Sequence, residues 1–156
     1  MDEHQLMRHA IRAARTGIAA GQSPFGCAVA RGDQLLVATH NTVRADTDIT
    51  AHAEINAVRR ACREVDAIFL DECTVATTCE PCPMCLTALH WSRAGQVYYG
   101  ATIEDAAQAG FNELQVGAAQ LLVQGGSRLK LSPGVLVAEC RSLFEEWLNS
   151  PEADAY

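Results

Sequence analysis

Residues 72–102 read ECTVATTCEPCPMCLTALHWSRAGQVYYGAT, and the pattern of this stretch is the most informative about the fold class. The run ECTVATT predicts a strand, PCPMCLTALHWSRA predicts a helix that begins at its prolines, and QVYYGAT predicts a second strand. Two strands joined through a helix are parallel neighbours, and the crossover helix covers one face of their sheet. The stretch therefore predicts one parallel unit of an α/β fold.

The residues before this stretch add two helices and a hairpin. Apolar residues recur at helical spacing from Asp2 to Ala20, and Gly21 is a plausible stop signal. The runs CAVAR and LLVATHNT flank Gly32-Asp33-Gln34, a pattern typical of a β-hairpin. After the polar stretch RADTDIT, the segment AHAEINAVRRACREV predicts a second helix, with Thr50 as its N-cap.

The residues after the stretch are less regular. EDAAQAGFNE predicts a loop, ELQVGAAQLLVQ a short helix that ends at Gly125, SRLKLS a strand, and VLVAECRSLFEEWLN a final helix. No repeat, linker or block of charge marks a boundary, so we expect a single domain over residues 1–156. The predicted fold class is α/β, a three-layer α/β/α sandwich around a mixed sheet that an antiparallel hairpin opens.

Composition narrows the class of function. The chain has 156 residues, 49% of them hydrophobic, which excludes a disordered protein. Its net charge of −7 argues against a broad nucleic-acid surface and favours a small-molecule substrate. Neither a secretory signal nor an apolar run long enough to span a membrane is visible, so we expect a cytoplasmic protein. Seven cysteines, three of them in CEPCPMC, indicate a metal or redox site rather than a disulfide framework.

Two short motifs each open a predicted helix: His52-Ala53-Glu54 and Pro81-Cys82-Pro83-Met84-Cys85. Cysteines three apart on a helix share one face, so Cys82 and Cys85 can reach one ion. Residues two apart, such as His52 and Glu54, point in different directions around a helix and converge only beyond its end. We therefore expect His52, Cys82 and Cys85 to hold a metal ion off the ends of both helices.

This ligand set predicts catalytic zinc. One neutral imidazole and two thiolates balance the charge of Zn²⁺ and leave its fourth position to water. Zinc lowers the pKa of bound water from about 15.7 to about 7, which yields hydroxide near neutral pH. Glu54, left unligated, is then the expected catalytic residue, because a carboxylate beside that water can carry its proton to a ring nitrogen and to a departing amine.

The pair HAE and PCPMC resembles the zinc deaminase signature H-x-E with P-C-x-x-C, so the chain is similar to the cytidine and nucleobase deaminase superfamily. That resemblance implies a five-stranded sheet and the hydrolytic removal of an exocyclic amine from a purine or pyrimidine ring. Further matches, PFG at Pro24 to Gly26, TAHAE at Thr50 to Glu54 and DAAQAGF at Asp105 to Phe111, resemble bacterial guanine deaminases. The implied reaction converts guanine to xanthine and ammonia, a step of purine metabolism.

The same resemblance implies a substrate pocket and a homodimer. Asn41 would bond the purine edge, and Phe25 and Trp91 would wall the ring. Glu113 would accept hydrogen bonds from the amide and amine of guanine, as an ionised carboxylate can. Tyr156 would cap the neighbouring subunit's site. The expected substrate-binding residues are Asn41, Phe25, Ala53, Trp91, Glu113 and Tyr156.

Other interpretations stay open. The segment RLKLSPGVLVAECRSLFEEWL is similar to the last strand and helix of tRNA adenosine deaminases, although the acidic ending FEEWLNSPEADAY argues against RNA. Guanosine, cytosine, isocytosine and ammeline are alternative small substrates. A structural site is the non-enzymatic alternative, in which Cys79 completes a closed Cys₃His zinc shell. Phe25 and Trp91 are also compatible with ordinary packing, and Asn41 with capping of a turn.

Overall fold

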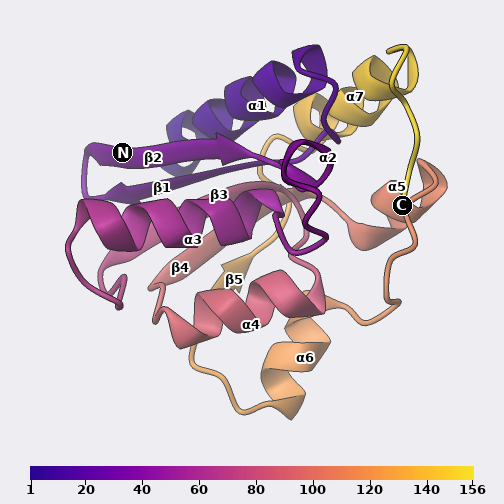
Figure 1. Ribbon diagram of the computed structural model, residues 1–156. Helices are drawn as coiled ribbons and strands as arrows, with labels where there is room; N and C mark the ends of the chain where they lie inside the picture. The colour runs from indigo at the N-terminus through magenta and orange to yellow at the C-terminus, as the bar shows by residue number, and fades with distance from the viewer.

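The computed structural model describes residues 1–156 and is built around one five-stranded sheet (Figure 1). The strands lie in the order β2-β1-β3-β4-β5. Their bounds are β1 Gly26–Arg31, β2 Gln34–His40, β3 Cys73–Cys79, β4 Gln96–Ala101 and β5 Lys130–Ser132. Strand β1 is antiparallel to β2 and β3, whereas β3, β4 and β5 are parallel. The predicted mixed sheet, its opening hairpin and its parallel crossover are confirmed.

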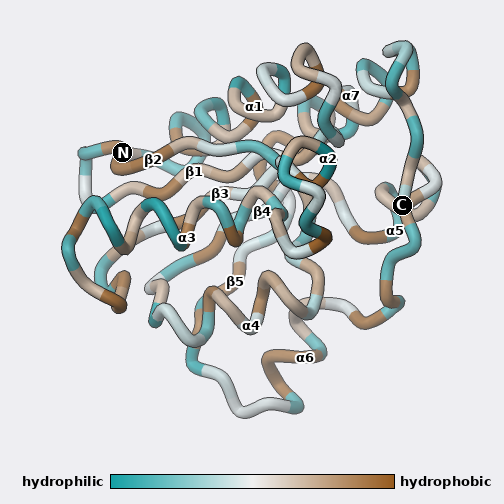
Figure 2. Tube along the Cα trace, viewed as in Figure 1, coloured by the Kyte–Doolittle hydropathy of each residue, from teal (hydrophilic) through white to brown (hydrophobic).

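Helices cover both faces of this sheet, which confirms the three-layer architecture (Figure 1). Helices α1 (Glu3–Ala19) and α7 (Val137–Leu148) pack on one face, and α3 (Ala53–Glu64) and α4 (Pro83–Trp91) on the other. Side chains of β1 alternate between the two cores, as the period of a strand requires: Ala28 and Ala30 join α1, while Cys27 and Val29 join α3. Hydrophilic and hydrophobic positions accordingly alternate along α1 and α3 (Figure 2). None of the helices is both long enough and apolar enough to cross a lipid bilayer.

Three short helices differ from the expectations. Helix α5 (Ile103–Gln108) occupies the first half of the segment predicted as a loop, and Thr102 and Asp105 form a capping box at its start. Helix α6 (Ala118–Gln124) begins five residues later than ELQVGAAQLLVQ predicted, and α2 (Val43–Asp46) lies in the polar stretch. The segment between α5 and α6, residues 109–117, has no regular secondary structure.

The start of α3 also differs from the expectation, and the difference matters for the site. The backbone N–H and the hydroxyl of Thr50 both donate to Asp48 Oδ1, at 2.8 and 2.7 Å, so Thr50 is occupied elsewhere and is not the N-cap. His52 holds that position instead, with extended backbone angles. An N-cap side chain projects from the end of its helix, and His52 therefore faces the tip of α3 rather than its flank.

Candidate active site

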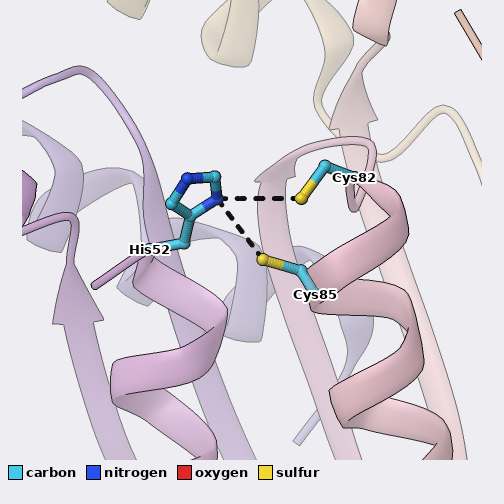
Figure 3. Close-up of side chains that lie close together, drawn as sticks. All are labelled: His52, Cys82 and Cys85. Atoms are coloured by element: carbon cyan, nitrogen blue, oxygen red, sulfur yellow. Dashed lines mark hydrogen bonds between the residues drawn. The ribbon is translucent and has the colours of Figure 1, made fainter. Parts of the chain in front are cut away.

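The predicted metal ligands meet at the N-terminal ends of α3 and α4, beside the end of β3 (Figure 3). His52 is the N-cap of α3, Cys82 is the N-cap of α4, and Cys85 lies one turn into α4. His52 Nδ1 points at both sulfurs, 3.7 Å from Cys82 Sγ and 3.5 Å from Cys85 Sγ. The three ligand atoms all lie within 4.8 Å of one another.

This spacing fits zinc. In a tetrahedral site with Zn–S of about 2.3 Å and Zn–N of about 2.0 Å, a sulfur and a nitrogen ligand stand roughly 3.6 Å apart. The two measured separations bracket that value. Cys79, the candidate for a fourth protein ligand, lies outside the group and donates its thiol to Thr102 O at 3.3 Å. The three side chains thus match zinc with one coordination position not filled by protein.

The pKa values of the two cysteines are shifted in opposite directions. The interaction with the Cys85 thiol, together with the nearby His52, lowers the pKa of Cys82 to about 4. The same interaction and burial raise the pKa of Cys85 well above its usual value. Burial alone lowers the pKa of His52, but the hydrogen bond with Cys82 and the charge of Glu54 outweigh it and raise that pKa. Metal binding therefore displaces protons from this cluster.

Glu54 lies next to the ligands without joining them. Its side chain is only 6% exposed, and its Oε1 accepts a hydrogen bond of 2.7 Å from the hydroxyl of Thr77 on β3. Burial, reinforced by the charge of Cys82, raises the pKa of the Glu54 carboxyl. Such a group gains a proton more readily than a free glutamate, which suits general acid and base chemistry. Sequence reasoning missed Thr77, because its contact joins strand β3 to helix α3 across the fold.

A cavity of about 330 Å³ opens over the ligands and Glu54. Phe25 forms part of its wall and packs edge-on against Phe111, with 4.9 Å between ring centroids. Glu113 also faces the cavity, where burial raises the pKa of its carboxyl. The remaining lining residues are Ile49, Cys79, Glu80, Pro83, Met84, Phe111, Asn112, Leu114 and Tyr156. The cavity therefore brings together Phe25, Glu54 and Glu113, three of the residues expected at the site.

The tail of the same chain closes one side of this cavity. Tyr156 lines it, and the backbone carbonyl of Tyr156 accepts a hydrogen bond of 3.0 Å from Asn112 N. The Tyr156 hydroxyl accepts from Asn41 Nδ2, so fully buried Asn41 contacts the tail and lies outside the cavity lining. Ala53 is likewise buried outside the lining, with its carbonyl bonded to the Thr39 hydroxyl at 2.8 Å. The single chain thus places Tyr156 in its own pocket, in contrast to the expected capping of a neighbour.

Trp91 does not wall the cavity of its own chain, and that expectation is wrong. It is the last residue of α4, whereas Cys82 caps the first turn, so the length of the helix separates them. Its side chain is 74% exposed and contacts only the ring of His90 among the aromatic groups. The aromatic partner that sequence reasoning missed is Phe111, although it ends the quoted motif DAAQAGF.

Comparisons with known proteins agree with this geometry. Guanine deaminase from Bacillus subtilis (strain 168) is 40% identical over 72% of this chain and 73% of its own, and its X-ray structure superposes with a TM-score of 0.70. A structure of guanine deaminase from Nitrosomonas europaea is 27% identical, covers 94% of this chain and 84% of its own, and has a TM-score of 0.85.

Proteins named for tRNA modification are also similar. The tRNA-specific adenosine deaminase of Aquifex aeolicus (strain VF5) is 34% identical over 65% of this chain and 67% of its own. A tRNA(Ile)-lysidine synthase of Deinococcus deserti is 35% identical over 94% of this chain, but the match spans only 28% of that longer protein. Finally, the profile of the family described as "Cytidine and deoxycytidylate deaminase zinc-binding region" matches residues 1–101. The family match agrees with the three side chains whose spacing fits zinc and with the five-stranded mixed sheet. The chain therefore belongs to this family of zinc-dependent deaminases.

Proposed function

We propose that this protein hydrolyses guanine to xanthine and ammonia, with zinc held by His52, Cys82 and Cys85. The observation that carries the proposal is that one cavity of about 330 Å³ joins this ligand triad to two carboxylates, Glu54 and Glu113. Glu54 lies beside the metal ligands, and Glu113 lies on the lining segment that follows α5. The similarity to two guanine deaminases supports guanine as the substrate.

The chemistry assigned to the side chains balances. Zinc, when bound, supplies hydroxide near neutral pH. Glu54 takes one proton from water and delivers it to N3 of guanine as a C–O bond forms at C2. It then moves the proton of that new hydroxyl to the amine, so that the C–N bond breaks, ammonia leaves and xanthine keeps a carbonyl at C2. Thr77 holds Glu54 in place through its hydrogen bond at 2.7 Å. Removal of bulk water by the buried surroundings strengthens each of these contacts.

Recognition is assigned to the rest of the pocket. The ring N1–H and the amine of guanine are donors, and the Glu113 carboxylate is an acceptor that faces them from the wall. Phe25, Phe111 and Tyr156 enclose the ring, with Phe111 edge-on to Phe25. Asn41 contributes through Tyr156, whose hydroxyl it binds. The proposal also includes a single domain over residues 1–156, a homodimer and a cytoplasmic location. The seven unpaired cysteines suit a reducing compartment such as the cytoplasm. The resemblance to guanine deaminases supports the dimer.

A panel scored by ammonia release tests this function. The zinc-loaded protein is assayed with guanine, guanosine, cytosine, isocytosine, ammeline and a tRNA that carries the target adenosine. Guanine is expected to be turned over fastest, and Glu54→Gln is expected to lose at least about a hundredfold in kcat while it keeps one zinc per chain. Turnover of tRNA adenosine without turnover of any free base would instead favour the tRNA-deaminase function, which the similarity to the Aquifex aeolicus enzyme makes the second candidate.

A further inference from the structure

Glu80 is a buried carboxylate that lines the cavity but touches neither the metal ligands nor Glu54 by any hydrogen bond. Its two oxygens are directed at backbone groups instead. Oε1 accepts a hydrogen bond of 2.7 Å from Ala118 N, and Oε2 accepts one of 3.4 Å from Ile103 N. These two amides belong to the first residues of α6 and α5.

The two bonded amides bracket one wall of the pocket. The chain from Ile103 to Ala118 includes Phe111, Asn112, Glu113 and Leu114, and all four line the cavity. Glu80 therefore sits on one strand-to-helix connection and holds both ends of the segment that faces the metal ligands. No other buried acidic side chain bridges two helix starts in this way.

Beyond Phe111, whose buried ring packs in the aromatic core, the wall has few other anchors. Asn112 N is bonded to the C-terminal residue, but the backbone bonds that follow are local, from Glu113 N to Phe111 O and from Val116 N to Leu114 O. The start of α5 has its own capping box, whereas α6 has Gly117 at its N-cap and no capping side chain in its own sequence. After Asn112, the next backbone group of this segment that is bonded to a distant part of the chain is Ala118 N, and its acceptor is Glu80.

We infer that Glu80 is a positioning residue for substrate specificity, which acts by fixing the wall that presents Glu113 to the purine edge. This inference rests on the proposed purine deamination. Glutamine at this position keeps the size of the side chain but replaces one acceptor oxygen with an NH₂ group, which cannot accept from a backbone N–H. One of the two anchors is then lost, and Glu113 is held less firmly against the donors that it reads.

The test compares Glu80→Gln with the wild type on the base that the wild type deaminates fastest. We expect KM to rise about tenfold, kcat to change by less than about threefold, and zinc to stay at one per chain. Glu113→Gln and the double variant complete a cycle, and the effects on kcat/KM should be non-additive because both changes act on one contact. Asp105→Asn is the control, since it weakens the capping box of α5 and the ion pair with Arg141 but leaves both hydrogen bonds of Glu80 in place, and it should leave KM within about twofold.

Amide hydrogen exchange separates this inference from the proposed function, because it needs no turnover. At least one of the Ile103 and Ala118 amides should exchange at least about tenfold faster in Glu80→Gln, and unchanged exchange of both amides would overturn the inference. A wild type that deaminates no base contradicts the proposed function instead. Additive effects in the cycle, or an unchanged KM, also overturn the role of Glu80. If Glu80→Gln does not fold, Glu80→Asp, whose shorter side chain keeps the charge but loses reach, should raise KM in the same way.

Discussion

The side-chain nitrogen of Asn41 lies 2.7 Å from the hydroxyl oxygen of Tyr156, the last residue of the chain. Asn41 is fully buried, and its other side-chain atom, Oδ1, accepts a hydrogen bond from Val43 N at 3.1 Å. Asn41 is therefore fixed in position by the start of α2 and offers a rigid donor to the tail. A residue that sequence reasoning assigned to the substrate thus holds the residue that closes the pocket.

Removal of the Tyr156 hydroxyl should loosen the tail. Tyr156→Phe leaves a buried N–H of Asn41 without its acceptor, at a cost of about 1–3 kcal/mol. The Asn112 amide, which donates to Tyr156 O, should then exchange about ten- to a hundredfold faster. Tyr98→Phe is the control, because the Tyr98 hydroxyl makes no hydrogen bond within the chain. Unchanged protection of Asn112 in Tyr156→Phe would show that the hydroxyl does not anchor the tail.

Thr77→Val tests whether the rate depends on the exact position of the Glu54 carboxylate, because the variant keeps Glu54 but removes its hydrogen bond to Thr77. Valine has the shape of threonine but cannot donate to Glu54 Oε1, so the carboxylate loses its only side-chain anchor. We expect kcat to fall about tenfold with zinc content unchanged, because misplacement of a proton-transfer group costs rate rather than folding. Thr77→Ser should restore most of the rate, and Thr74→Val on the same strand should have little effect. Full activity in Thr77→Val would remove this role from Thr77.

Zinc content distinguishes an open site from a closed Cys₃His shell. Cys82→Ser should lower bound zinc from one to nearly none per chain, because hydroxyl oxygen is a poor zinc ligand. Cys79→Ser should keep one zinc, since its sulfur lies outside the ligand group and donates to Thr102 O. Metal analysis of both purified variants checks this, and a Cys79→Ser protein without zinc would favour the structural site.

Helix α1 packs so closely on β1 that residue 26 has no room for a side chain. A Cβ at Gly26 would lie 2.1 Å from Ala10 O and 2.8 Å from Ala14 N, which are backbone atoms that cannot turn aside. Gly26→Ala should therefore lower the free energy of unfolding by about 3 kcal/mol or more, measured by urea denaturation. Gly117→Ala, whose Cβ would meet Glu80 Oε1 at an ordinary 3.7 Å, should cost less than about 1 kcal/mol. Similar losses in both variants would contradict the close packing.

The ion pair between α1 and α7 should make stability depend weakly on pH. The hydrogen bond from Arg15 to Glu146, 2.8 Å from Nη2 to Oε1, lowers the pKa of the Glu146 carboxyl below its value in the unfolded chain. Its stabilisation is present above the unfolded pKa, about 4.3, and is lost as pH falls through the folded pKa. Both side chains are partly exposed, so we expect at most about 1 kcal/mol at pH 7. Unfolding of the wild type and Glu146→Gln, followed from pH 7 to pH 3, should converge at the acid end; a constant difference would exclude the charge as its cause.

Much of this protein follows from short stretches of its sequence. The alternation of apolar residues predicts the hairpin, the crossover helix and the parallel strands, because each element buries one face and repeats with its own period. The metal ligands can also be predicted from local spacing, because Cys82 and Cys85 lie about one helical turn apart and His52 stands at the start of a second helix. The helix start at Thr102 is also a local feature, since Thr102 and Asp105 stand three residues apart as a capping box requires, although the segment is predicted above as a loop.

The contacts that could not be predicted from the sequence all join residues that are distant in the chain. Asn41 meets Tyr156, Glu80 meets Ala118, and Thr77 meets Glu54, and no spacing rule connects the members of any of these pairs. Trp91 shows the opposite case. It lies close to Cys85 in the sequence, but it ends α4, and the length of that helix separates it from the metal ligands in space. Periodicity is a property of neighbours along the chain, whereas these contacts depend on how packed layers bring the ends of separate elements together.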